Sequence, residues 1–173
     1  MKFFILYAQP DVEEYAKPGE AINRLRRGCR FSEFQYLDRK PLDVEISDDS
    51  GDEFPDFILQ GIIPLVSTGI KRVLENFGVD YVFFKPIRLT RSELGIAEDY
   101  FLALPPRIDC LDERSVIVNK HAKKIFVDDD KIGRYDIFKL SGVDNQEIIV
   151  TEKLKDALAA KSFENLFFSE LEG

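Results

Sequence analysis

The segment Ile63–Ile87 carries the signals of a strand, a capped helix and a second strand in immediate succession. Ser67 suits the helix N-cap, because its hydroxyl can accept a hydrogen bond from a backbone N–H of the first turn. Gly78 suits the C-terminal end of the helix, where the left-handed conformation is favoured. Between them, apolar residues recur at helical spacing, at Ile70, Val73, Leu74 and Phe77. The segment therefore predicts a helix over Thr68–Phe77 with a buried face, flanked by strands.

A second segment, residues 148–168, repeats the same order of features. Thr151 takes the place of Ser67, and Glu152 puts a negative charge in the first helical turn, where the helix dipole favours it. These signals predict a second helix over Glu152–Ala160, with Leu154 and Leu158 on its buried face. In this register, Val66, Lys71, Leu74, Phe83 and Phe84 match Val150, Lys155, Leu158, Phe167 and Phe168. Two interpretations stay open: one strand–helix–strand unit (63–87 and 148–168) is duplicated, or two unrelated capped helices share generic features.

The rest of the chain predicts short strands separated by turns. Pro86 should limit the strand that begins at Tyr81, because proline has no N–H to donate within a sheet. Residues 88–98 are expected to form a loop. Further strands are expected at residues 2–8, 44–46, 100–104 and 134–140, with a hairpin formed by 116–118 and 124–127. No linker divides the sequence, so we expect one α+β domain over residues 1–173, mostly antiparallel, with two main helices.

Composition narrows the class of protein. With 173 residues, 45% of them hydrophobic, the chain can bury the core of an ordinary domain. Its net charge of −8 disfavours nonspecific binding to nucleic acid, whose phosphates require Lys and Arg. No stretch reaches the length of a membrane span, and acidic residues closely follow the apolar run Phe3–Tyr7, unlike a signal peptide. We therefore expect a cytoplasmic protein that binds neither nucleic acid nor membranes.

The sequence offers few candidates for catalysis. Its one histidine, His121, lies between lysines and is expected to be a solvated turn residue rather than a base. Asp109 and Asp112 could form an acid pair or hold a metal, but the adjacent Cys110 would face the opposite side of a strand from Asp109. Cys29 and Cys110 have no CxxC spacing, and a disulfide between them is left open. We expect no catalytic residue, no cofactor and no metal site.

Two kinds of charged segment are candidates for binding. The only basic cluster, Arg24–Arg30, is either an anion site or a solvated face. Two acidic segments, Asp48–Glu53 and Asp128–Asp130, have the composition of turns. Their acids are Asp48, Asp49, Asp52, Glu53, Asp128, Asp129 and Asp130. They would attract a basic partner surface, or they are ordinary solvated loops.

Six short segments of the sequence, taken in order, resemble a known family. They are Pro55–Ile58, Ile63–Ser67, Leu74–Asp80, Ile108–Asp112, Asp136–Leu140 and Val150–Lys155. Together they resemble the bacterial immunity-protein family that is found beside polymorphic toxins. The resemblance covers residues 54–168, whereas residues 1–53 match little and form a variable part. It implies a cytoplasmic antidote that binds and neutralises a cognate toxin by protein–protein interaction, without catalysis.

Under this resemblance, the acidic segments are candidate contacts for a toxin with a basic surface, such as the nucleic-acid cleft of a nuclease. Two other functions stay open from the residues alone. One is an enzyme that acts on a small molecule, with an anion site near Arg24–Arg30. The other is a structural or regulatory module that associates with itself through exposed strand edges. A deep pocket with convergent polar groups would favour the enzyme, and a broad surface without one would favour the antidote.

Overall fold

A computed structural model describes residues 1–172, apart from the side chain of Gln35. The chain forms two compact units. Unit 1 comprises Met1–Tyr7, Pro105–Ser162 and Phe167–Gly173, and unit 2 comprises Ala8–Leu104 and Phe163–Leu166. Each unit has its own sheet and its own hydrophobic core, and most strand pairs are antiparallel, which confirms the α+β class. That the two units form one domain stays a prediction.

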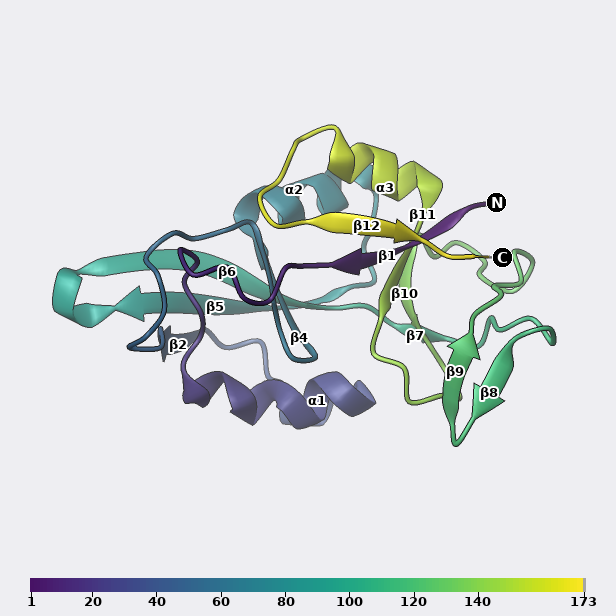
Figure 1. Cartoon of the computed structure of the whole chain (residues 1–173), viewed down its shortest axis with the longest axis horizontal. Coiled ribbons are helices and arrows are strands. Elements are labelled where there is room, and N and C mark those ends of the chain that lie inside the picture. Colours follow the sequence, from purple (N-terminus) through teal and green to yellow (C-terminus); the bar gives the residue numbers. More distant parts are fainter. Residues whose placement is uncertain (173) are drawn as a thin grey trace. The chain divides into compact units, whose positions relative to one another are not determined.

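Unit 2 is built on a five-stranded sheet in the order β2-β5-β6-β4-β3 (Figure 1). The strands are β2 (Leu42–Glu45), β3 (Phe57–Gln60), β4 (Ile63–Ser67), β5 (Phe83–Arg91) and β6 (Ile96–Leu104). Neighbours are antiparallel except β2 and β5, which are parallel. Helix α2 (Thr68–Phe77) follows β4 over the predicted range. It buries Ile70 and Leu74 as predicted, whereas Val73 is only partly buried.

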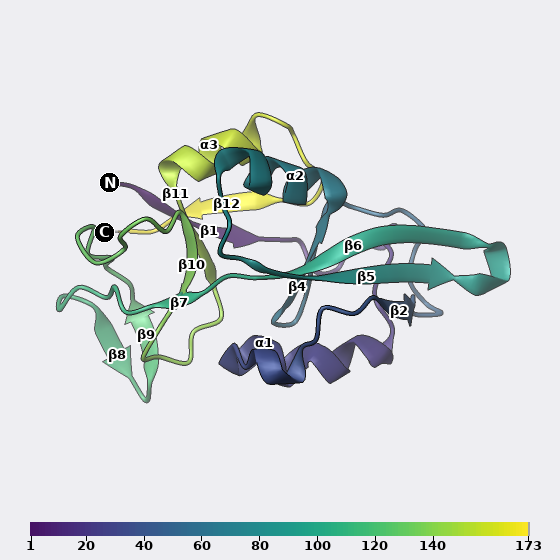
Figure 2. The ribbon, with the colours of Figure 1, turned by 180° about the vertical axis from the view of Figure 1, so that it is seen from behind.

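Unit 2 contains a further helical segment, which was not predicted. It runs through the 3₁₀ turn Glu20–Leu25, α1 (Arg26–Phe31) and the 3₁₀ turn Phe34–Tyr36. Its buried apolar residues, Ile22, Leu25 and Cys29, recur at helical spacing and join the core of the unit. Figure 2 shows α1 and α2 on opposite sides of the sheet of this unit. The sheet is therefore covered by a helix on each face.

Two sequence predictions about β5 and β6 were wrong. Residues 88–98 are not a loop, because β5 continues to Arg91, β6 starts at Ile96, and only the 3₁₀ turn Ser92–Leu94 joins them. Pro86 does not end β5, although this strand lies between β2 and β6. The proline is tolerated because β2 pairs with β5 only from Ile87 onward. At Pro86 the strand is paired with β6 alone. On the side of β2, the missing N–H of the proline therefore removes no sheet hydrogen bond.

Unit 1 has a second five-stranded sheet, in the order β12-β1-β11-β10-β7. The strands are β1 (Phe3–Tyr7), β7 (Arg107–Ile108), β10 (Ile137–Leu140), β11 (Ile148–Thr151) and β12 (Phe167–Glu170). Helix α3 (Glu152–Ala159) follows β11 and buries Leu154 and Leu158, as predicted. No helix within residues 1–172 is long and apolar enough to cross a membrane.

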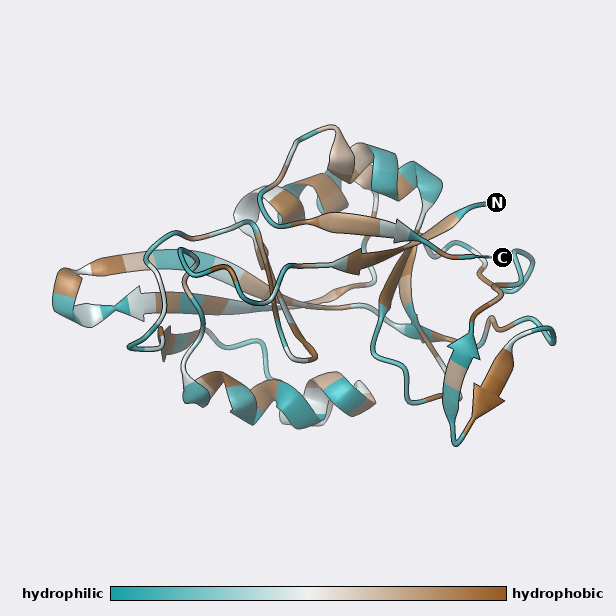
Figure 3. Ribbon diagram, in the orientation of Figure 1, coloured by the Kyte–Doolittle hydropathy of each residue, from teal (hydrophilic) through white to brown (hydrophobic). Residues whose placement is uncertain are grey.

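A separate hairpin of unit 1 joins β8 (Val116–Val118) to β9 (His121–Lys124). The hairpin was predicted, but its second strand was expected at 124–127. Asn119 and Lys120 adopt the left-handed conformation and make a tighter turn than expected. The hydropathy colouring of Figure 3 shows that β8 is hydrophobic along its length.

The sheets of the two units share one four-stranded arrangement. Strands β3-β4-β6-β5 correspond to β10-β11-β1-β12, every neighbouring pair is antiparallel in both sets, and a helix follows the second strand. The registers also agree. Val66 pairs with Phe57 and Phe101, just as Val150 pairs with Ile137 and Phe4. The sequence match also pairs Val66 with Val150. Topology and register therefore favour a duplicated strand–helix–strand unit over two unrelated capped helices.

The two arrangements differ in chain order. In unit 2, β6 follows β5 directly, whereas in unit 1 the equivalent strand, β1, comes from the beginning of the chain. Circular permutation of a repeated unit produces this relationship. It explains why residues 2–8, which lie far from the second repeat in the sequence, complete the sheet of that repeat.

Candidate functional surfaces

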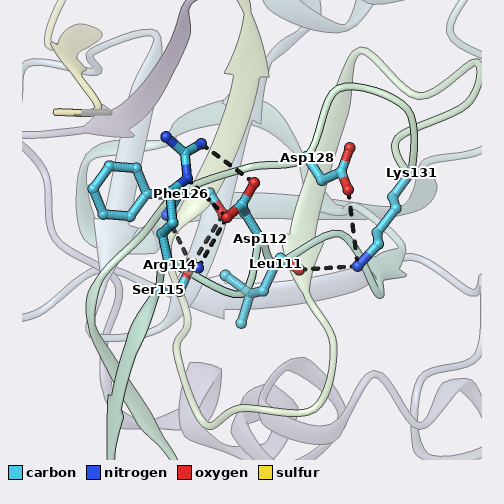
Figure 4. A network of polar contacts seen from close by, with 7 residues as sticks. All are labelled: Leu111, Asp112, Arg114, Ser115, Phe126, Asp128 and Lys131. Carbon is cyan, nitrogen blue, oxygen red and sulfur yellow. Dashed lines mark hydrogen bonds and ion pairs between the residues drawn. The ribbon is translucent and has the colours of Figure 1, made fainter.

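A cavity of about 440 Å³ in unit 1 is lined by charged side chains, among them Asp112, Arg114 and Asp128. Figure 4 shows this network. Arg114 binds Asp112 with two hydrogen bonds, Nε to Oδ1 at 2.9 Å and Nη2 to Oδ2 at 3.2 Å. The Arg114 side chain thereby lowers the pKa of Asp112. A carboxylate held ionised in this way does not suit a general acid.

The predicted acidic turn Asp128–Asp130 borders the same cavity. Asp128 Oδ1 accepts a hydrogen bond from the Asp130 backbone at 3.0 Å, and its Oδ2 lies 3.9 Å from Lys131 Nζ. Asp129 Oδ2 lies 3.1 Å from the Met1 nitrogen. Two of the three acids therefore already face a positive charge, so the turn presents less net negative charge than its sequence indicates.

The other predicted acidic segment, Asp48–Glu53, is an exposed loop of unit 2 that is anchored at several points. Arg91 Nε lies 2.6 Å from Asp52 Oδ1, and Arg91 Nη2 donates a hydrogen bond to the Ser50 carbonyl at 3.1 Å. Gly51 packs so closely against the backbone of Glu14 that an added Cβ would lie 2.1 Å from its carbonyl oxygen. The loop is therefore held in place while Asp48, Asp49, Asp52 and Glu53 remain exposed.

The remaining candidates for chemistry do not come together. Asp109 is exposed and Cys110 is fully buried, and both lie just after β7 (Arg107–Ile108) and not within a strand. Burial raises the pKa of the Cys110 thiol to about 11, which makes it a poor nucleophile at neutral pH. Cys29 and Cys110 are both buried thiols rather than a disulfide. His121 is the first residue of β9, partly buried, rather than a solvated turn residue.

Among residues 1–172, no group of three or more His, Cys, Asp or Glu side chains is placed to hold a metal ion. The cavities beside Asp112, His121 and Phe34 have no Ser, Thr or Cys side chain in their lining.

The basic cluster forms part of a surface that sequence patterns did not reveal. Arg24, Arg26, Arg27 and Arg30 are all exposed on the helical segment of unit 2. Two of them lie over aromatic rings: Arg27 lies 4.5 Å from the centroid of Tyr36, and Arg30 lies 5.3 Å from that of Phe31. The inward helical spacing of Ile22, Leu25 and Cys29 was the available signal for this helix, and hence for which residues face outward.

The sequence profile of the Immunity protein family (Imm11) matches residues 9–173. The chain belongs to this family. The Imm11 match includes most of residues 1–53, so it extends beyond the 54–168 range whose segments carried the resemblance. No protein of curated function matches the chain. Membership of the Imm11 family indicates a role in toxin immunity.

Proposed function

We propose that the chain is a cytoplasmic immunity protein that binds a cognate bacterial toxin and neutralises it by contact alone. One observation carries the proposal: the Imm11 profile matches residues 9–173 and so extends over both compact units. An antidote of this kind requires a stable scaffold with an exposed, charged surface. The chain meets that requirement, because each of its two sheets packs on a hydrophobic core and charged loops lie at the surface.

We further propose that the acidic residues steer the toxin during encounter. The chain has a net charge of −8, and a toxin with a basic surface would be attracted to it over distances of about a Debye length. The residues concerned are Asp48, Asp49, Asp52, Glu53, Asp128, Asp129 and Asp130. Asp128 and Asp129 each face a cation, so the greater contribution is assigned to the loop Asp48–Glu53. Charges at the rim of an interface act mainly on the association rate.

Affinity capture from the native host tests the proposal. The tagged chain is used to isolate bound proteins, and each captured protein is then expressed alone in a laboratory bacterium. The proposal expects one captured protein to arrest growth and co-expression of the chain to restore it. It is contradicted if no captured protein is toxic, or if the chain fails to restore growth when both proteins are present in the same cell.

A further inference from the structure

Three large aromatic side chains lie exposed within six residues of each other in unit 2. Phe31 is 53% exposed, and Phe34 and Tyr36 are each 48% exposed. Folded proteins normally bury most of such rings, because each carries a large apolar surface. A cluster of exposed aromatic residues therefore marks a surface that gains stability when another molecule covers it.

Two of these rings contact neighbouring side chains of unit 2. Phe34 stacks on Phe83, with 5.2 Å between ring centroids, and Arg27 covers one side of Tyr36. The buried side chain of Leu37 packs directly against Gly28. A Cβ at position 28 would lie 2.3 Å from Leu37 Cγ, so this contact requires glycine there. A surface that is ordered before binding loses less entropy when it binds.

The charge of this segment is opposite to that of the whole chain. Residues 24–40 contain six basic residues and two acidic ones, in a chain whose net charge is −8. Arg27, Arg30 and Arg39 each lie over an aromatic ring, at 4.5, 5.3 and 4.7 Å from the centroids. Arginine and aromatic side chains are the types enriched at the energetic centres of protein interfaces, whereas lysine is depleted there.

A cavity of about 520 Å³ lies beside the rings. It is lined by Phe34, Leu37, Asp38, Arg39 and residues 80–83. Its aromatic wall suits an apolar side chain of a partner. Asp38 and Asp80 line the cavity beside Arg39, so carboxylates of the partner are assigned to Arg27 and Arg30 and not to the cavity itself. Such a pocket beside exposed aromatic residues is the usual setting for an anchor residue at an interface.

We propose that the toxin binds to this arginine–aromatic face, which is formed by Arg27, Arg30, Phe31, Phe34, Tyr36 and Arg39. The proposal rests on the proposed function and names the chemistry of its contact: a part of the toxin that presents carboxylates around an apolar or aromatic anchor, distinct from the basic surface that the acidic loop Asp48–Glu53 would attract. A second copy of the chain is disfavoured, because a symmetric contact would bring two positively charged faces together. Nucleic acid is disfavoured by the overall charge of −8.

The affinity test uses the toxin that the wild-type chain captures from the native host. Tyr36→Ala and Phe31→Ala should each weaken its binding on the order of 10- to 100-fold, as expected for interface hot spots. Leu94→Ala, at a residue that is 58% exposed in the 3₁₀ turn Ser92–Leu94, is the matched control and should leave affinity unchanged. Circular dichroism and unfolding curves confirm that each variant folds.

A charge-reversal pair tests the sign of the partner surface. Arg27→Glu with Arg30→Glu should weaken binding at least as much, whereas Arg72→Glu with Lys153→Glu, which changes net charge equally at exposed helical positions, should not. Equal effects of the two pairs would mean that only overall charge matters, and they would overturn the proposal. A toxin that binds the Tyr36 and Arg27/Arg30 variants as tightly as the wild type would also overturn it, while leaving the proposed function intact.

Photo-crosslinking in native host cells tests the same face even when the toxin has not been identified. A photoreactive phenylalanine analogue replaces Tyr36 in one variant and Leu94 in the control. The proposal expects a crosslink from position 36, and none from position 94, to a protein that arrests growth when it is expressed alone. A crosslink from position 36 to the chain itself or to nucleic acid, or the absence of any crosslink there, would contradict it.

Discussion

Ser67 and Thr151 hold equivalent positions in the two units, each as the last residue of a sheet strand and the N-cap of the helix that follows. Ser67 Oγ accepts a hydrogen bond from the Ile70 backbone at 3.3 Å, and Thr151 Oγ1 accepts one from the Leu154 backbone at 3.5 Å. Thr151 is the more buried of the two, and its hydroxyl also donates a hydrogen bond to Asp136 Oδ1 at 2.8 Å. The helix cap is therefore common to both units, whereas the hydrogen bond to Asp136 belongs to unit 1.

Removal of the two caps should have unequal effects on stability. Ser67→Ala should lower the free energy of unfolding by about 1 kcal/mol, the usual cost of a lost N-cap. Thr151→Ala should cost more, by about another 1 kcal/mol, because it also breaks the bond to Asp136. Urea unfolding measures both, and Thr151→Ser, which keeps the hydroxyl, serves as the control. Equal losses for the two alanine variants would mean that the Asp136 bond contributes nothing.

The apolar faces of α2 and α3 provide a second prediction. Leu74→Ala should destabilise the protein by about 2–5 kcal/mol, through lost burial and the cavity that remains. Leu158→Ala should have a similar effect, because both side chains are almost fully buried. Val73→Ala is the internal comparison and should cost clearly less, since Val73 is only partly buried. An unfolding midpoint for Leu74→Ala within error of the wild type would show that Leu74 is not a core residue.

Local signals predicted the elements that have caps and regular spacing. Ser67, Gly78 and the spacing from Ile70 to Phe77 define α2, because the residues that start and end a helix lie directly beside it in the sequence. The continuation of β5 past Pro86 could not be predicted, since it depends on where β2 begins to pair. The placement of β1 beside β11 is likewise a contact between distant parts of the chain. The helical segment of residues 20–36 has apolar residues at helical spacing, Ile22, Leu25 and Cys29. This pattern was not recognised, because the segment was interpreted as a basic cluster.

That the acidic residues contact a partner stays a prediction, and composition alone does not tell which of them face a cation. The acidic residues were identified by composition, and the structure shows that Asp52, Asp128 and Asp129 each face a cation. No pattern in the sequence says that Phe31, Phe34 and Tyr36 stay exposed, because the same residue types usually form a core. In the structure Leu37 occupies the inward position beside Gly28, while these three rings remain at the surface.

The contact between Asp38 and Lys85 should make stability depend on pH. Lys85 is almost fully buried, and its Nζ donates hydrogen bonds to Asp38 Oδ1 at 2.9 Å and to the carbonyls of Asp38 and Lys40. The bond from Lys85, followed by one from the Lys40 backbone, lowers the pKa of Asp38. The stabilisation is therefore present above the ordinary pKa of aspartate, about 3.9, and is lost as the pH falls through the lower folded value.

Unfolding curves recorded from pH 6 down to about pH 2 test this dependence. Wild type should lose more stability over that range than Asp38→Asn, which cannot ionise at this position. Other acids contribute equally in both proteins, so the difference isolates Asp38. Parallel pH profiles for wild type and variant would contradict the assignment.

The acidic loop of unit 2 provides a prediction about association kinetics. Changing Asp48, Asp49 and Asp52 to Asn, and Glu53 to Gln, should slow association with the captured toxin at low salt and leave dissociation nearly unchanged. The difference from wild type should shrink as salt rises and the Debye length falls below about 10 Å. A control that neutralises four other exposed acids of unit 2, Asp43, Glu93, Glu98 and Asp99, separates the loop from net charge. Stopped-flow association across a salt series measures the rates, and equal rates for loop and control variants would remove a specific role for the loop.

The central claim is that the chain neutralises its toxin by binding and not by catalysis, and a titration of toxin activity tests it most directly. Increasing amounts of the chain are added to a fixed amount of the captured toxin, at concentrations well above the dissociation constant, and residual activity is measured after short and long incubation. The account predicts a sharp endpoint at a fixed molar ratio that does not move with time, and the same endpoint for His121→Ala. Neutralisation by substoichiometric amounts that increases with incubation time, or its loss in a folded His121→Ala variant, would contradict it.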